Sequence, residues 1–385
     1  MKKTVFIALL CLINGVYSQN KTSQTFKPSV TIGGRIMYDF EFLKAGSYSV
    51  NGNEFRRVRL HAKGNVSKFI KYKVEFDFAK GAPAFRDVYI QFKLPKNIGS
   101  LKFGSFTEPS SMDNMISSNN ITFYERSMLS NTQPFKYNAG ILFENYNLFN
   151  QNITFQLAHT FNGDKELAFK DSELENGANL IVRTTKAFFK KKENHQLIHF
   201  GLNYEHRKNN SNTYKYKFTF EDHLGDKFVV NPPGNFKNTA DFGAELAATY
   251  KSFTFQTEFE ASSIVTDIDT YKANGFYVSG SYFLTGEHKI YKNGVFKGTT
   301  PIKDIDNNGF GAIELTARYS SMDFTNFPTA SSGDKISNIT AGVNWYLNVH
   351  SRLMYNYTVT DFNAFNLYGN NQNLHGHLIR LQVNF

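Results

Sequence analysis

Four basic residues, Arg57, Arg59, His61 and Lys63, occupy every second position of one short segment, FRRVRLHAK at 55–63. Alternate residues of a β-strand point to the same face, so these side chains would form one column at a spacing of about 6 to 7 Å. The arginine guanidinium is always charged, and its forked donors match tetrahedral oxyanions. The column therefore predicts a path along which a phosphate-like anion is handed from site to site.

A second interpretation of this column is structural. Glu75, Asp77 and Asp87 follow it on neighbouring predicted strands, and the arginines would then only balance these carboxylates in the wall of the protein. The sequence leaves both interpretations open. Arg56 has the wrong parity for the column, so we expect it at a rim or after a β-bulge.

The column requires strands, and period-two alternation predicts them. Residues 30–42 alternate strictly between apolar and polar side chains, with Arg35 on the polar face, and residues 69–79 alternate with Lys73 on the polar face. Such segments suit strands tilted across a bilayer, which need about nine to eleven residues, whereas soluble strands average about five or six. One face carries rings and aliphatic side chains and the other carries charge, as in a transmembrane β-barrel.

The composition supports this fold class and excludes others. The 385 residues include 39 Phe and 21 Tyr, and the hydrophobic content of 41% excludes a disordered chain. No segment beyond the N-terminus reaches the roughly 18 to 20 apolar residues of a spanning helix, which excludes an ordinary helical membrane protein. Lys and Arg total 43 against 33 Asp and Glu. We assign this basic excess to a wetted inner wall rather than to nucleic-acid binding.

Seventeen segments alternate well enough to be strands, and a bacterial single-chain barrel needs an even number. We assign 213–221 to a loop because it lies in an Asn- and Lys-rich stretch, which leaves an all-β, 16-stranded antiparallel barrel with short periplasmic turns and long external loops. The connection 107–137 either folds into the channel or stays at the surface. The connection 286–308 is the exception to the alternation of long loops and short turns, because it is long where a short turn is expected. The remaining candidate strands are 30–42, 55–64, 69–79, 86–94, 99–106, 138–145, 152–162, 178–189, 197–207, 240–250, 252–261, 274–285, 309–320, 336–347, 350–360 and 375–385, and the long connections include 43–54 and 262–273.

The N-terminus predicts export. Residues 1–18 combine Lys2 and Lys3 with an apolar stretch and a small-residue cleavage site, so they form a signal peptide. A lipoprotein signal at Cys11 is the rival. Segment 19–29 then leads into a single barrel domain, 30–385. Because Cys11 is the only cysteine, the mature chain has no disulfide, thiol catalysis or thiolate metal site.

Motifs for catalysis or metal binding are weak, and we expect no catalytic residues, cofactor or metal. The histidines lack HExxH spacing, and no nucleophile elbow, P-loop or Rossmann glycine pattern is present. Asp304, Asp306 and Asn308 resemble early ligands of a calcium loop, but the acidic residue that should end the loop is missing. A hydrolase would need a Ser/His pair at the rim, for which His159 and His199 are the only partners.

Several motifs together resemble the phosphate-selective porin O and P family of bacterial outer membranes. They include Phe55 to Leu60, Glu75 to Ala79, Arg86 to Ile90, Gly104 to Pro109, Ser117 to Asn119, Thr122 to Arg126, Gly280 to Glu287, Glu314 to Ser320 and Asn344 to Asn348. The resemblance implies a homotrimer of 16-stranded barrels that conducts small anions, with arginines and a lysine at a constriction binding phosphate or polyphosphate. By matched motif, the arginines are Arg56, Arg57, Arg59 and Arg126.

The leading hypothesis is a passive, preferentially anion-conducting outer-membrane porin that contacts membrane lipid and small anionic solutes. Its candidate pore-lining residues are Arg57, Arg59, Arg56, Lys63, Arg35, Lys73 and Arg126. Two alternatives remain: a channel for oligosaccharides or other nutrients, and a non-conducting structural or adhesive barrel that works through its external loops.

Overall fold

The computed structural model describes residues 26–132, 137–161, 177–189, 194–208, 214–327, 335–361 and 373–385. The predicted signal peptide, 1–18, and most of segment 19–29 lie outside these residues. Within the described ranges, no helix is long and apolar enough to cross a membrane.

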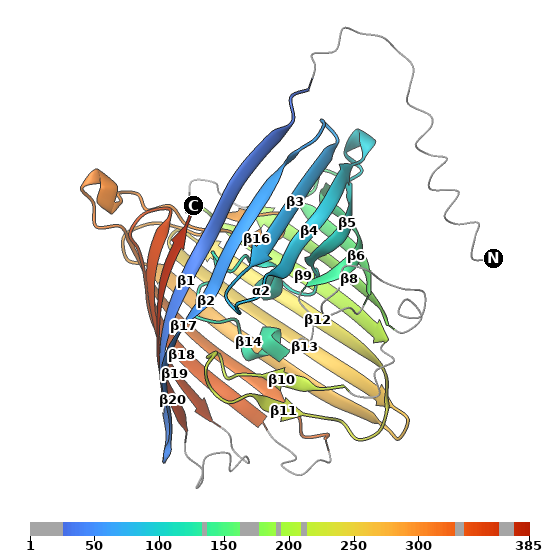
Figure 1. Cartoon of the computed structure of the whole chain (residues 1–385), viewed down its shortest axis with the longest axis vertical. Coiled ribbons are helices and arrows are strands. Elements are labelled where there is room, and N and C mark those ends of the chain that lie inside the picture. The colour runs from blue at the N-terminus through green and yellow to red at the C-terminus, as the bar shows by residue number, and fades with distance from the viewer. Residues whose placement is uncertain are drawn as a thin grey trace, which may run out of the picture.

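Sixteen antiparallel strands close into one barrel, as predicted (Figure 1). The first strand pairs with the last from Arg35 opposite Asn384 to Lys44 opposite His375, which closes the sheet and leaves no free edge. The barrel strands are β1 (Ser29–Ala45), β2 (Tyr48–Asn65), β3 (Ile70–Asp77), β4 (Ala84–Lys93), β5 (Ser100–Thr107), β6 (Tyr137–Leu148), β7 (Ile153–Phe161), β8 (Ala178–Phe189), β9 (Leu197–Lys208), β12 (Phe236–Tyr250), β13 (Phe253–Thr266), β14 (Thr270–Phe283), β17 (Ala312–Asp323), β18 (Lys335–Tyr346), β19 (Ser351–Asp361) and β20 (Leu374–Asn384).

The two faces of the barrel wall differ as the alternation predicts. On β2, Leu60 points outward and is 46% exposed, whereas the neighbouring Arg59 points into the lumen and is buried. The same division holds around the barrel, where Phe, Tyr, Leu, Ile and Val side chains on many strands are exposed. A lipid-facing apolar surface and a polar lumen follow, since every backbone group pairs within the closed sheet.

Two predicted external connections are wrong because the strands continue through them. β1 runs to Ala45 and β2 starts at Tyr48, so only a tight turn replaces the predicted connection 43–54. Likewise, β13 and β14 leave only 267–269 of the predicted connection 262–273. Outside the bilayer neither face of a strand needs to be apolar, so the alternation ends although the hydrogen-bonded ladder continues.

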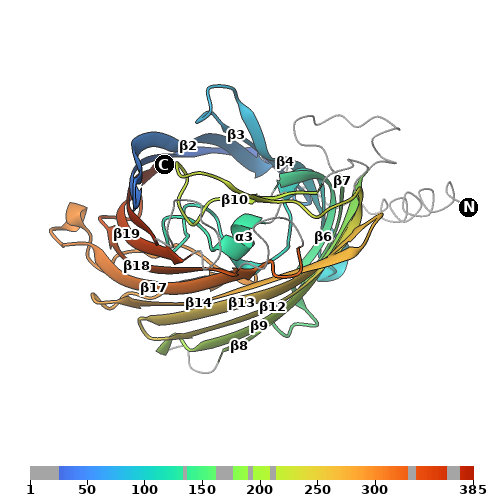
Figure 2. The same cartoon turned by 90° about the horizontal axis from the view of Figure 1, so that it is seen from below.

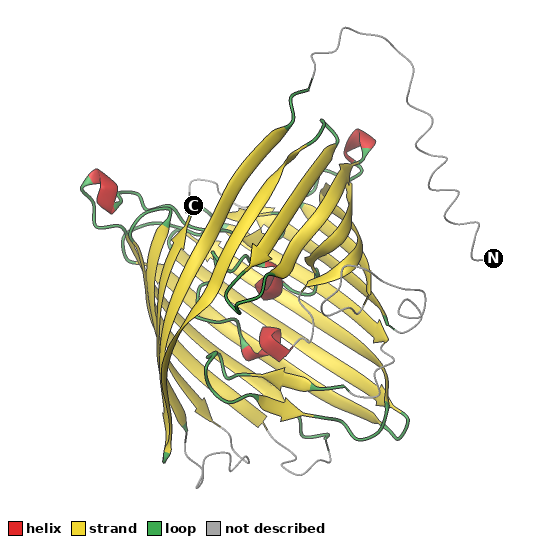
Figure 3. Cartoon of the chain, in the orientation of Figure 1, coloured by secondary structure: helices red, strands yellow, loops and turns green. Residues whose placement is uncertain are grey.

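The elements outside the barrel wall are short (Figure 3). The prediction that 213–221 is a loop element is confirmed for its described residues, 214–221, because β10 (Tyr216–Phe218) pairs only with β11 (Phe228–Val230) in a separate two-stranded sheet. The other short elements are the 3-10 helices η1 (Pro95–Asn97) and η3 (Ile305–Asn307), the α-helices α2 (Met112–Met115) and α3 (Met128–Thr132), and the strands β15 (Tyr291–Lys292) and β16 (Val295–Phe296).

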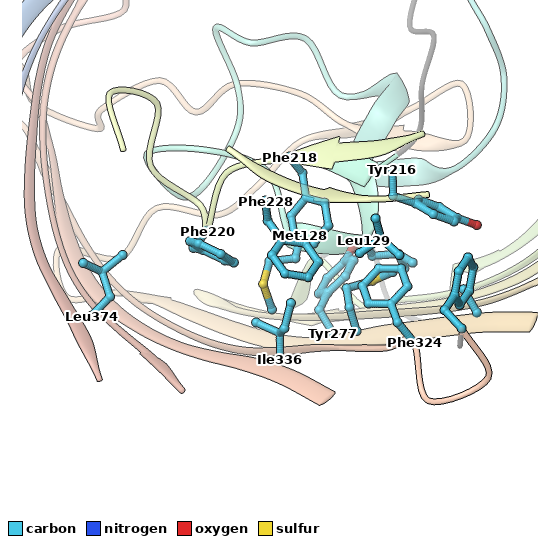
Figure 4. Packing of buried hydrophobic residues seen from close by; sticks show 14 of the residues in the cluster. Met128, Leu129, Tyr216, Phe218, Phe220, Phe228, Tyr277, Phe324, Ile336 and Leu374 are labelled. Atoms are coloured by element: carbon cyan, nitrogen blue, oxygen red, sulfur yellow. The ribbon is translucent and has the colours of Figure 1, made fainter. Parts of the chain in front are cut away.

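The connection between β5 and β6, which carries α2 and α3, folds into the lumen (Figure 2). Met128 and Leu129 of α3 pack with Phe218 and Phe228 of the β10–β11 hairpin, with Phe324 directly after β17, and with side chains of the wall such as Ile336 (Figure 4). Burial of each such side chain contributes roughly 1.5–3 kcal/mol. This aromatic cluster therefore fixes the connection across the channel instead of leaving it at the surface.

The long connection after β14 also enters the lumen, from the rim of the short turns. Its hairpin turns at Asn293 and Gly294. Both residues have positive φ, as in the type I′ turn of a two-residue hairpin. Val295 and Phe296 are 2% exposed and pack with Met112 and other residues of the β5–β6 connection. The exceptional length of 286–308 is thus explained: these residues form a second element inside the barrel.

Candidate anion-binding site

A cavity of about 350 Å³ lies in the lumen between the strands β1 to β6 and the inward connection that carries α2 and α3. Its charged lining consists of seven basic side chains and three carboxylates, an excess of positive charge. The basic residues are Arg35, Arg56, Arg57, Arg59, Lys73, Arg86 and Arg126, and the acidic residues are Glu75, Asp87 and Glu125. We call this space the arginine cavity.

Arg56 and Arg86 have the strand parity of the outer face, and β-bulges bring both to the cavity. The register between β1 and β2 shifts at Met37, which makes Arg56 the extra residue of β2. A second shift between β3 and β4 makes Arg86 one of the extra residues opposite Glu75. A bulge re-aims its side chain, so both guanidinium groups join the lumen side: Arg56 Nε lies 2.8 Å from Glu125 Oε1.

Carboxylates hold arginines of the cavity such as Arg59 and Arg35 in place, as the structural interpretation of the column predicts. Arg59 Nε lies 2.8 Å from Asp77 Oδ2, and its Nη1 lies 3.2 Å from Glu75 Oε1. Arg35 Nη2 also pairs with Glu75, at 3.3 Å. Even with Asp77 counted beside the three carboxylates of the lining, four carboxylates cannot neutralise seven cations, so the pairs orient the guanidinium groups while the cavity retains a positive charge.

The inward connection contributes both a carboxylate and an arginine. Burial alone would raise the pKa of Glu125, but Arg56, Arg57 and Arg380 together hold it well below its usual range. Arg126 is buried and has no carboxylate oxygen within 4 Å among the described residues; its donors bind the backbone oxygens of Asp113 at 2.8 Å and Ile116 at 2.5 Å. Its charge is therefore uncompensated at close range.

Six of the seven predicted pore residues line the arginine cavity, and Lys63 does not. Lys73 is there, with its Nζ 2.6 Å from Asp87 Oδ2 and 3.1 Å from Glu75 Oε2. Lys63 sits directly opposite Lys73 in the β2–β3 register but is exposed. Of the predicted column, only Arg57 and Arg59 line the cavity; His61 does not, and Lys63 lies near the end of β2.

The sequence interpretation missed two residues of this site. Alternation alone places Arg86 on the outer face of β4, because a bulge cannot be seen in it. Tyr137, at the start of β6, lines the cavity beneath Arg59, whose guanidinium carbon is 5.9 Å from the ring centre. An aromatic ring attracts a cation in this position, but the signal appears only when β2 and β6 are brought together.

The weaker alternatives find no support in the geometry. His159 lies on the outer face of the wall and is exposed, and the ring nitrogens of the buried His199 bond to Tyr291 and Glu245 rather than to a serine. Asp304 accepts a hydrogen bond from the backbone N–H of Asn307 and so caps η3. Among the described residues, no group of three or more potential ligands is arranged to hold a metal ion.

Comparisons with known proteins agree with the fold. The chain matches the phosphate-selective porin O and P family over residues 30–385. It is 24% identical to Porin O of Pseudomonas aeruginosa over 363 residues, covering 83% of this chain and 80% of that protein.

Solved structures show the same fold at low identity. OmpT of Vibrio cholerae, in a trimer form, matches with a TM-score of 0.61 at 11% identity, over 94% of this chain and all of that one. An anion-selective porin from Comamonas acidovorans matches with a TM-score of 0.56 at 13% identity, over 93% of this chain and all of that one. From the family match over nearly its whole length, the chain belongs to the phosphate-selective porin O and P family and is a porin of the bacterial outer membrane.

Proposed function

We propose that this porin gives passive diffusion to small solutes with a preference for anions, and that the arginine cavity binds phosphate-type oxyanions on their way through. The observation that carries the proposal is the charge of the cavity, with seven basic side chains against three carboxylates. A passing anion gains Coulomb energy there, and the energy is larger than in bulk water because loops and wall exclude much of the solvent.

The donor chemistry supports an oxyanion rather than a simple halide. Guanidinium groups offer paired donors that match two oxygens of a tetrahedral anion. Hydroxyl groups stand beside them: Arg35 Nη1 donates to Ser118 Oγ at 2.7 Å, and Ser117 and Ser130 also line the cavity. The name of the family, phosphate-selective porin O and P, points to the same class of solute.

The lining also bears on the alternative solutes. A channel for oligosaccharides would present aromatic faces and few charges, whereas Tyr137 is the only aromatic residue among those that line this cavity. A small charged space between wall and loops favours single, compact anions such as phosphate.

We further propose a homotrimer in the membrane. The solved OmpT structure that this fold matches is described in a trimer form, and the family resemblance implies the same assembly. Electrophoresis of the unheated protein in mild detergent, followed by chemical cross-linking in lipid vesicles, should give a band at three times the monomer mass. A monomer under both conditions would contradict this assembly.

The experiment for anion preference is the reversal potential of the purified protein in a planar bilayer under a KCl gradient. We expect a reversal potential with the sign that indicates anion preference, and inorganic phosphate should block the chloride current. The variant Arg57→Gln, Arg59→Gln removes two charges from the cavity and should lower both the preference and the block. A cation-selective or non-conducting wild type would overturn the proposal, and unchanged block in the variant would move the site elsewhere.

A further inference from the structure

A second, smaller cavity of about 80 Å³ lies beside the short turn between β18 and β19. Its lining is formed mostly by amide and hydroxyl side chains, including Asn120, Thr299 and Gln382, together with one charged residue, Arg352. No carboxylate lines it. We call it the Arg352 cavity.

Arg352 is one of the two arginines without a carboxylate oxygen within 4 Å in the described part of the chain, and Arg126 is the other. Its side chain is 3% exposed. Nη1 donates to the backbone oxygen of Ile121 at 2.8 Å and Nη2 to Gln382 Oε1 at 2.7 Å, while the buried Nε has no partner among the described residues. An isolated buried charge is costly unless an opposite charge is supplied.

Glu314, which is linked to Arg352 through the Tyr346 hydroxyl, is already engaged by other groups. Tyr346 contacts Arg352 Nη1 at 3.2 Å and donates its own hydroxyl proton to Glu314 at 2.8 Å. Glu314 in turn pairs with Lys289, whose Nζ lies 2.9 Å from Glu314 Oε1. Arg352 therefore lacks a fixed counter-charge, although the other nine arginines of the lumen wall each have one.

One stretch of the inward connection separates the two cavities. Ser117 and Ser118 line the arginine cavity, while the next two residues, Asn119 and Asn120, line the Arg352 cavity. The stretch is tied to both walls, since Ser118 accepts a hydrogen bond from Arg35 and the backbone oxygen of Asn119 accepts one from Gln382 at 3.1 Å. Each of the two uncompensated arginines thus faces one side of a shared polar partition.

We propose that Arg352 forms a second anion-binding station, beside the turn rim of the barrel, which receives small oxyanions such as inorganic phosphate from the arginine cavity along Ser117 to Asn120. The inference rests on the proposed anion-conducting function and adds a second anion-binding site to the channel. Conduction through a binding channel needs more than one site, because an ion leaves a single deep site slowly. A station with one arginine and neutral donors holds an anion more weakly than the arginine cavity and suits release.

The test compares Arg352→Gln, Arg352→Lys and the wild type by phosphate block of chloride current in planar bilayers, at both voltage polarities. Loss of one charge-assisted hydrogen bond predicts an increase of about tenfold in the half-blocking phosphate concentration. The increase should occur at the polarity that drives anions in from the turn rim, while the reversal potential keeps its anionic sign. Arg352→Lys should restore most of the block.

A second variant keeps the inference testable if Arg352→Gln does not fold. Asn120→Asp adds a carboxylate to the Arg352 cavity and should weaken block at the same polarity, whereas Asn147→Asp, at an exposed position near the end of β6, is the matched control and should leave block unchanged. Wild-type block in both Arg352→Gln and Asn120→Asp would overturn the second station while leaving the anion preference of the arginine cavity standing. Loss of anion preference in the wild type itself would instead refute the proposed function.

Discussion

At the scale of single residues, the two interpretations of the basic column turn out to be compatible. Arg59 is clamped by Asp77 and Glu75, and Arg56 and Arg57 share Glu125. Clamped side chains do not need to be ordered when an anion arrives, which lowers the entropic cost of binding. The carboxylates orient the cations, and the surplus of cations leaves room for a mobile anion.

Lys63 and Lys73 offer a matched pair for testing the limits of the cavity. They are opposite each other on β2 and β3, but only Lys73 lines the cavity. We expect Lys73→Gln to raise the half-blocking phosphate concentration about tenfold, because Glu75 and Asp87 lose a counter-charge next to the anion. Lys63→Gln should leave it unchanged. Equal effects of the two variants in planar bilayers would show that the whole column acts on the anion.

Glu125 predicts a defined pH dependence of stability. Its pKa in the folded protein lies well below the unfolded value of about 4.5, so ionised Glu125 stabilises the fold above that pH, and the contribution is lost as the pH falls through the folded value. The stability difference between wild type and Glu125→Gln should be constant at neutral pH and shrink below about pH 4.5. Heat-dependent mobility in gels, measured over a pH series, checks this. A difference that grows in acid would contradict it.

At the scale of elements, the channel is shaped by segments that come from both rims. The β5–β6 connection and the β10–β11 hairpin enter from the rim of the long connections, and the β15–β16 hairpin enters from the opposite rim. The last of these is anchored by Arg183, whose Nη2 donates to the backbone oxygen of Gly294 at 2.8 Å. The constriction therefore depends on contacts between elements far apart in sequence.

Gly294 tests whether the β15–β16 hairpin narrows the channel. Its φ is +75°, and an added Cβ would lie 3.2 Å from Arg183 Nη1 and 3.3 Å from Thr154 Oγ1. Gly294→Val should cost about 1–3 kcal/mol in backbone strain, with crowding in addition, and should displace the hairpin, raising the single-channel conductance.

The matched control for this variant is Gly81→Val. Gly81 has a similar φ of +81°, but nothing lies within 4 Å of an added Cβ, so this variant carries the strain without the crowding and should conduct as the wild type does. An unchanged conductance in Gly294→Val would show that the hairpin does not limit the flow.

At the scale of the whole molecule, the barrel separates a lipid face from a wetted lumen and extends beyond the bilayer. β1 and β2 have 17 and 18 residues, well above the roughly nine to eleven needed to cross. The additional residues of β2, such as Ser49, Asn51 and Asn53, are polar and exposed on the face that carries Phe55 and Leu60 further along.

This boundary predicts different costs for one substitution at two outward-facing positions. Leu202→Arg, in the middle of β9 at a side chain 51% exposed, places a charge in lipid and should destabilise the barrel by about 2–4 kcal/mol. Asn51→Arg places the same charge on the extension of β2 and should cost about 0–1 kcal/mol. Urea unfolding in lipid vesicles measures both values. A large cost at Asn51 would place that part of β2 inside the bilayer.

The sequence by itself determined the barrel, its 16 strands and the face to which the strand residues outside the bulges point. Alternation is a local property that the bilayer imposes on every strand, so it can be read without knowing the partners. It also identified Arg35, Arg57, Arg59 and Lys73 as lumen residues, because they have the lumen parity of their strands.

Only the tertiary structure decided where the cavities lie and what lines them. The bulges that turn Arg56 and Arg86 inward are register differences between two strands, which neither strand records alone. The Arg352 cavity joins the end of the barrel wall to a loop more than 200 residues earlier in the chain, as in the hydrogen bond from Arg352 to Ile121. The charge of a site depends on which carboxylates come within reach, and closure of the sheet sets that distance.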